Sequence, residues 1–258
     1  MKIEQVAAIT YTIRDFIKDR EGVVESLKKL RKIGYQAVQI SGMAAKIDPT
    51  ELADIIEGEG LVCCATHEPG VELIERPEQV AAKLNALRCK YTAYPWPHNM
   101  DLFKSEEGVK FMCEKLENTG RVLKDAGIVF TYHNHNVEFV RIGGKLVLEH
   151  FYDETDPVLV QGELDTYWVQ HGGGNPVSWI QRLNNRLPLL HMKDYQTTIE
   201  HKATYAEIGQ GNLEWDKIIP AAEAAGCKWF IVEQDTCPGD PFDSLKISFD
   251  YIKENLVE

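Results

Sequence analysis

The sequence has no pair of cysteines at the C-x-x-C spacing and no apolar run long enough to cross a membrane. Nor does it start with the basic and apolar segments of a secretory signal, because MKIEQVAAITYT reads directly into a strand. The six cysteines lie mostly in apolar stretches, as reduced core thiols do. We therefore expect a cytoplasmic protein that has no disulfide and no membrane partner.

Positive charge is also scarce: 28 Lys and Arg stand against 40 Asp and Glu, a formal net charge of −12. A field of this sign repels polyanions, so we expect no nucleic-acid partner. The glycine-rich stretches at 142–145 and 171–174, a predicted hairpin or turn and a predicted loop, lack the Gly-x-x-x-x-Gly-Lys frame of a phosphate loop. A compact neutral small molecule is the ligand that this composition favours.

Short runs rich in β-branched residues alternate with longer amphipathic stretches along the whole chain. The expected strands are Glu4–Thr12, Gln36–Ser41, Val62–His67, Lys90–Trp96, Ile128–His135, Leu159–Asp165, Leu189–Asp194 and Trp229–Glu233. Such alternation predicts a parallel sheet covered by helices, and about 250 residues is the usual length of one (β/α)₈ barrel. The rival, an open doubly wound sheet, usually has a glycine-rich loop after its first strand, which is absent from 11–14. We expect a single α/β domain, a (β/α)₈ TIM barrel over residues 1–258.

Helical periodicity is clearest in three stretches between these strands. Val23–Gly34 and Glu107–Gly127 each carry one apolar stripe and end on a glycine, a common helix stop. Leu213–Gly226 has a weaker pattern because Pro220 should kink the helix or mark its first turn.

Metal-competent side chains stand at the ends of four successive predicted strands: His133, Asp165, His191 and Glu233. The carboxyl ends of barrel strands form one rim, so these side chains should converge there. Oxygen and imidazole ligands suit Mn²⁺, the ion we expect first, and also Mg²⁺, Co²⁺ or Zn²⁺. The fourth ligand stays open at this point, because His133 and His135 share one face of the same predicted strand and Glu138 follows just beyond it.

Other polar and aromatic residues lie near the same rim. We expect catalytic roles for Glu233, His135, Lys193 and Glu138, and substrate contacts from His67, Trp168, Tyr94 and Trp96. Lys193 either holds a substrate oxygen or forms a buried salt bridge with Glu163. The aromatic faces suit packing against the C–H face of a ring.

Four motifs carry a family resemblance: LDTYW (164–168), LLHMKD (189–194), EIGQGNLEW (207–215) and FIVEQD (230–235). The chain resembles the xylose-isomerase-like TIM barrels of the sugar phosphate isomerase/epimerase group. This group includes ketose 3-epimerases, hydroxypyruvate isomerase, inosose dehydratase and endonuclease IV. The resemblance implies that Asp165, His191 and Glu233 match three of the four metal ligands of the ketose epimerases.

The chain departs from the ketose epimerases at two positions. His133 stands where they usually have a glutamate ligand, and Trp168 stands where they have a histidine. The resemblance implies a metal-dependent isomerase or epimerase of a sugar or keto-sugar that acts through an enediolate. The alternative is a metal-dependent dehydratase or lyase on a keto-sugar, keto-glycoside or keto-inositol, which the histidine-rich fifth strand favours. The substrate is then a small carbohydrate, and assembly into a homo-oligomer is left open.

Overall fold

Eight parallel strands close into a barrel in the computed structural model, which describes residues 1–258. They are β1 (Val6–Ile9), β2 (Ala37–Ile40), β3 (Val62–His67), β4 (Tyr91–Tyr94), β5 (Val129–His133), β8 (Gln161–Asp165), β9 (Leu189–Met192) and β12 (Trp229–Val232). Each pairs in parallel with its neighbours, and β1 closes the ring against β12 with Ala7 beside Ile231. The predicted (β/α)₈ fold is confirmed.

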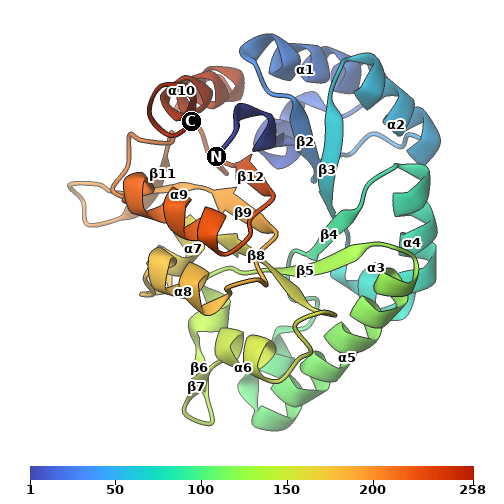
Figure 1. Ribbon diagram of the computed structural model, residues 1–258, viewed down its shortest axis with the longest axis vertical. Coiled ribbons are helices and arrows are strands. Elements are labelled where there is room, and N and C mark those ends of the chain that lie inside the picture. Colours follow the sequence, from blue (N-terminus) through green and yellow to red (C-terminus); the bar gives the residue numbers. More distant parts are fainter.

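Helices surround the barrel on its outside (Figure 1). They are α1 (Arg20–Ile33), α2 (Pro49–Gly58), α3 (Gly70–Glu75), α4 (Pro77–Ala86), α5 (Glu106–Asp125), α6 (Val147–Asp153), α7 (Thr166–His171), α8 (Pro176–Arg182), α9 (Trp215–Ala224) and α10 (Pro241–Asn255). Side-chain caps start several of them: Asp19 accepts from the amide of Gly22, and Ser105 from that of Gly108. Helix α1 ends before Gly34, as predicted. Gly34 adopts φ 132°, which only glycine reaches without strain.

Short elements account for the differences from the sequence prediction. The first strand is shorter than expected because 3₁₀ helices flank it, η1 (Ile3–Gln5) and η2 (Thr10–Phe16). Helix α9 runs through Pro220 without ending there. The remaining 3₁₀ turns are η3 (Met100–Lys104) and η4 (Val137–Phe139).

Two antiparallel hairpins stand outside the barrel sheet. The first, β6 (Arg141–Ile142) with β7 (Lys145–Leu146), turns through two glycines with positive φ and matches the predicted hairpin. The second, β10 (Asp194–Thr197) with β11 (Ala203–Ala206), was not predicted and directly follows the carboxyl end of β9. Buried Asp194 anchors it by accepting hydrogen bonds from the indole of Trp215 and from backbone amides that include Gly209 and Gly211.

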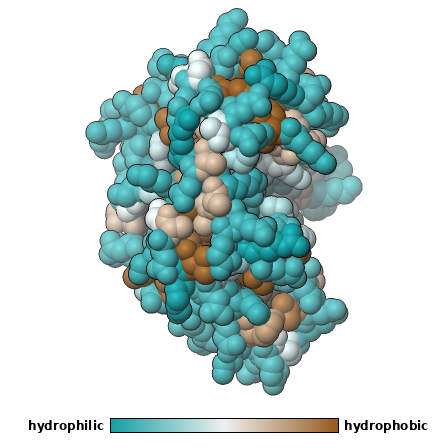
Figure 2. Space-filling model, turned by 90° about the vertical axis from the view of Figure 1, so that its right-hand side faces the viewer, coloured by the Kyte–Doolittle hydropathy of each residue, from teal (hydrophilic) through white to brown (hydrophobic).

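The apolar core fills the space between the barrel and its helices, and a smaller apolar cluster that includes Ala7, Ile9 and Ile231 lies apart from it. The outer face drawn in Figure 2 is mainly hydrophilic, with apolar patches set among polar side chains. None of the helices combines the length and the apolar character needed to span a bilayer. All six cysteines are unpaired, and five of them are buried.

Candidate active site and metal centre

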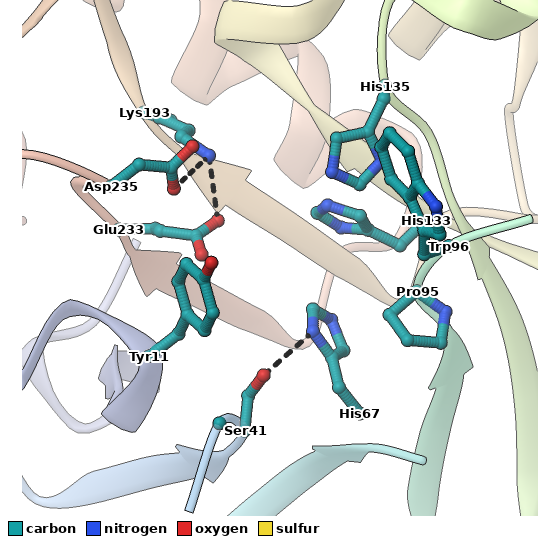
Figure 3. Close-up of a pocket in the computed structure, with 11 residues that line it drawn as sticks. Tyr11, Ser41, His67, Pro95, Trp96, His133, His135, Lys193, Glu233 and Asp235 are labelled. Carbon is teal, nitrogen blue, oxygen red and sulfur yellow. Dashed lines mark hydrogen bonds and ion pairs between the residues drawn. The ribbon is translucent and has the colours of Figure 1, made fainter. Parts of the chain in front are cut away.

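The carboxyl ends of the barrel strands surround a cavity of about 280 Å³ (Figure 3). It is lined by Tyr11, Ser41, Gly42, His67, Pro95, Trp96, His133, His135, Lys193, Glu233 and Asp235. Six residues that the sequence predicted at this rim therefore line one cavity: His67, Trp96, His133, His135, Lys193 and Glu233. Acidic and cationic groups lie on one side of it in Figure 3, and imidazoles and the Trp96 indole on the other.

Four side chains at the base of the cavity could hold one ion: His133, Asp165, His191 and Glu233. Their ligand atoms all lie within 4.8 Å of one another, and all four residues are buried. Oδ2 of Asp165 has no hydrogen-bond partner, and Nδ1 of His133 lies 3.2 Å from Glu163. A buried carboxylate oxygen without a partner is costly unless something binds it, so this donor set fits a divalent ion. The other oxygen of Asp165 caps α7 by accepting from the amide of Trp168, which fixes the carboxylate.

The protonation of this group is set by burial and by close charges. Burial lowers the pKa of His133 to about 3, with a further contribution from His191, so its imidazole is neutral. Burial alone would lower the pKa of His191, but Glu163 and Glu233 raise it to about 10. Burial alone would likewise raise the pKa of Glu233, which Lys193 and His191 hold well below its ordinary value. A bound cation would take the place of the proton on Nδ1 of His191, which faces Glu233.

A second group of possible ligands shares two histidines with the first: His67, His133, Glu163 and His191. Its central carboxylate already has hydrogen bonds at both oxygens. Oε1 of Glu163 accepts from Nε2 of Gln39 at 2.6 Å, and Oε2 lies 2.6 Å from Nε2 of His67. Because these donors use the lone pairs of Glu163, we place the candidate metal centre at the first group.

Lys193 provides the positive charge on the acidic side of the cavity. Its Nζ lies 2.6 Å from Asp235, 3.2 Å from Glu233 and 3.6 Å from Asp165. Burial alone would lower the pKa of Lys193, but these carboxylates raise it above its ordinary value, so the side chain is an ammonium. The predicted alternative of a salt bridge with Glu163 is wrong, because Lys193 lies beyond the end of β9 and Glu163 lies deeper in the barrel, among histidines.

His135 stands on the opposite side of the cavity, just beyond β5. Its ring packs edge-on to Trp96 at a centroid distance of 4.7 Å and lies 5.1 Å from Trp168. Burial, with His133 and Lys193 nearby, holds the pKa of His135 well below its ordinary value, so the ring is neutral. Its Nδ1 is buried and has no hydrogen-bond partner. The site thus contains an uncharged imidazole with one buried ring nitrogen that no other side chain engages.

Two residues expected at the site are directed elsewhere. Both oxygens of Glu138 are occupied, Oε1 by the hydroxyl of Tyr132 and Oε2 by the amide of His135, and Glu138 does not line the cavity. It therefore supports the loop after β5, which corrects its expected role as catalyst or fourth ligand. Tyr94 is fully buried and stacks on Tyr132, with its hydroxyl bonded to His98, so its expected substrate contact is also corrected. The sequence pattern placed both at the site because each lies within three residues of one that lines the cavity, Pro95 or His135.

The remaining aromatic expectations fit the cavity to different degrees. Trp96 lines it and is 49% exposed. Trp168, expected to contact the substrate, does not line the cavity; its indole packs against Lys193, whose Nζ lies 5.2 Å from the ring centroid, and against His135. Three residues that line the cavity, Tyr11, Ser41 and Asp235, were not predicted, and neither was Gln39 below it. The FIVEQD motif contains Asp235, two residues after Glu233, and this spacing was a clue that could have identified it.

Comparison with known proteins agrees with this geometry. The family described as xylose isomerase-like TIM barrel matches residues 27–255. An inosose dehydratase from Clostridium beijerinckii is 24% identical over 208 residues, covering 73% of this chain and 66% of the relative. The chain thus spans slightly less than two thirds of that relative.

Solved structures share the fold over nearly the whole chain. A sugar phosphate isomerase/epimerase from Parabacteroides distasonis is 22% identical with a TM-score of 0.84, covering 99% of this chain and 96% of its own. An L-ribulose 3-epimerase is 14% identical with a TM-score of 0.75, covering 99% and 95%. At these identities the structures establish the architecture. The family match over most of the chain shows that this protein belongs to the xylose isomerase-like TIM barrel family.

Proposed function

We propose that this protein is a divalent-metal-dependent dehydratase or lyase that acts on a keto-sugar, keto-glycoside or keto-cyclitol. The observation that carries this proposal is the position of His135, which lines the cavity across from Lys193 and has a buried Nδ1 without a partner. A neutral base opposite a cation suits removal of a proton next to a carbonyl. Glu138 is directed away from the cavity. The segment after β5 therefore supplies no second carboxylate for a symmetrical proton exchange.

The ion would be held by His133, Asp165, His191 and Glu233. When bound there, a divalent cation would act as a Lewis acid toward the keto and neighbouring hydroxyl oxygens of the substrate. Glu233 then has a holding role, because its Oε2 lies 2.8 Å from Nδ1 of His191, another proposed ligand, and accepts from Lys193 at 3.2 Å. This assignment moves the proton-abstracting role from Glu233 to His135.

The elimination needs only one proton-carrying group. A ring nitrogen of His135 takes the proton from the carbon next to the carbonyl, and the C–H electron pair forms the enolate. Lys193 stabilises the negative oxygen. The electron pair then returns, the bond from the β-carbon to its oxygen breaks, and the imidazolium gives its proton to the leaving oxygen. The products are an unsaturated ketone and water or an alcohol, with His135 neutral again.

Epimerisation is the second candidate, and it was the leading function in the sequence analysis. It shares the first step but requires a second group to return the proton from the other face. The ammonium of Lys193, which faces His135 from the other side of the cavity, supports it (Figure 3). The inosose dehydratase relative supports elimination, whereas the L-ribulose 3-epimerase structure supports the second candidate by fold alone.

Product analysis separates the two candidates. The Mn²⁺-loaded protein is incubated in D₂O with a panel of inososes, ketoses and 3-keto-glycosides, and products are followed by ultraviolet absorbance and NMR. Elimination predicts a new conjugated ketone with loss of water or alcohol. A recovered stereoisomer with deuterium at carbon, and no conjugated ketone, would replace elimination by epimerisation. Turnover of none of these compounds would contradict both.

A further inference from the structure

A continuous chain of hydrogen bonds lies directly below the candidate metal centre. It starts at Ser41, whose Oγ lies 3.2 Å from Nδ1 of His67. Nε2 of His67 lies 2.6 Å from Glu163, which also accepts from Gln39 at 2.6 Å. Oε1 of Gln39 lies 2.7 Å from Nε2 of His191. Side chains from β2, β3, β8 and β9 therefore meet in one buried network.

The directions of the two hydrogen bonds made by Gln39 are determined by chemistry. A carboxylate only accepts, so the amide nitrogen of Gln39 must face Glu163, since its oxygen at 2.6 Å would be repelled. The amide oxygen of Gln39 then faces His191 and can only accept. Nε2 of His191 must therefore carry a proton, which leaves Nδ1 as the nitrogen available to a metal ion.

The other ring nitrogen of His191 points into the candidate centre. Nδ1 lies 2.8 Å from Glu233 and 3.9 Å from Asp165, both of the first ligand group. Nε2 lies 3.5 Å from Glu163, on the side of the second group. The choice of ring nitrogen thus decides which of the two overlapping groups can use His191.

We propose that Gln39, itself held by Glu163, is a positioning residue that fixes the His191 tautomer so that Nδ1 faces the ion. The second ligand group, around Glu163, then supports the one metal centre and is not itself a second metal site. This inference rests on the proposed metal centre. Hydrogen-bond partners that fix a ligating histidine usually change metal affinity about 10- to 100-fold when removed.

Gln39→Met tests the proposal because it keeps the length of the side chain and removes both hydrogen bonds. Thr92→Val is the matched control: Thr92 is also buried and polar on a barrel strand, but its hydroxyl bonds only with Thr66. Affinity and stoichiometry are measured by Mn²⁺ titration. The protonated ring nitrogen of His191 is identified by ¹⁵N NMR in the Zn²⁺-loaded proteins.

We expect Nε2–H on His191 in the wild type and in Thr92→Val, with one ion per chain and equal affinities. Gln39→Met should bind Mn²⁺ about 10- to 100-fold more weakly and lose the single tautomer. Equal affinity and an unchanged tautomer in Gln39→Met would overturn the positioning role while leaving the metal centre intact. Wild-type protein that binds no ion would overturn both proposals.

Glu163→Gln provides a second test, in case Gln39→Met fails to fold. A glutamine at position 163 can still accept from Gln39 through its amide oxygen, so we expect one ion per chain with the same His191 tautomer. Two ions in the wild type, and one after Glu163→Gln, would show that the lower group is itself a metal site and would overturn the inference.

Discussion

Nζ of Lys193 lies 2.6 Å from Oδ1 of Asp235, and the lysine is only 1% exposed. Glu233, directly after β12, and Asp165, at the end of β8, approach the same ammonium. One buried cation therefore compensates several carboxylates before any ion binds. This arrangement places the charge of Lys193 at the wall of the cavity, where a substrate oxygen can reach it.

Lys193→Met should weaken both the metal-free fold and the reaction. Removing one partner of a buried charge group leaves the carboxylates uncompensated, and we expect the free energy of unfolding without metal to fall by about 3 kcal/mol. Because Lys193 is outside the donor set, the variant should still bind one ion, while kcat falls about 100-fold. Urea unfolding, metal analysis and kinetics measure these effects. Unchanged stability and kcat would contradict the role given to this cation.

Asp165→Asn should lose tight metal binding while keeping the fold. An asparagine oxygen can still cap α7 through the amide of Trp168, so the structural role survives. Mn²⁺ at about 100 times its Kd should stabilise the wild type by about 2.7 kcal/mol, and this gain should be absent in the variant. Thermal melting with and without Mn²⁺ measures it. If Mn²⁺ raised the Tm of the variant as much as that of the wild type, Asp165 would not be a metal ligand.

Trp96→Ala should change substrate binding, whereas Tyr94→Phe should change stability. Trp96 lines the cavity, so its removal should raise KM and leave stability nearly unchanged. Tyr94→Phe removes a buried hydroxyl bonded to His98, which should cost about 1 kcal/mol of stability without changing KM. Kinetics and urea unfolding of both variants check this. A raised KM in Tyr94→Phe would show that Tyr94 contacts the substrate.

Glu138 should make stability depend on pH. Burial raises its pKa to about 7, against the opposing hydrogen bonds from Tyr132 and His135. Because the folded pKa lies above the unfolded one, Glu138 stabilises the fold at low pH, and this contribution is lost as the pH rises from about 4 to about 7. The stability of the metal-free wild type relative to Glu138→Gln should fall over that range by roughly 3 kcal/mol. A difference that stays constant with pH would contradict the raised pKa.

The barrel could be predicted from the sequence because every strand run is bounded by turn residues and followed by a helical period. Strand ends such as Asp165 and His191 carry a polar side chain after an apolar run, so their meeting at one rim followed from topology. The hairpin β10–β11 was missed because its residues are polar and half exposed, a pattern that also fits an irregular loop.

The details of the site depended on contacts between distant segments. Gln39 carries no sequence signal, since a glutamine between apolar residues becomes meaningful only beside Glu163 and His191. The direction of Glu138 depends on how the chain turns after β5, which brings its carboxylate back to the amide of His135. Residue type and spacing do not determine such turns.

The most direct test of the proposed chemistry is the exchange of the proton next to the substrate carbonyl with D₂O, followed by NMR in wild type and in His135→Asn. His201→Asn is the matched control, because His201 is an exposed histidine at a positive φ of 61°, which asparagine tolerates. We predict that wild type and His201→Asn exchange this proton at equal rates, and that His135→Asn is at least about 100-fold slower with its metal content unchanged. Exchange at the wild-type rate in His135→Asn would contradict the account.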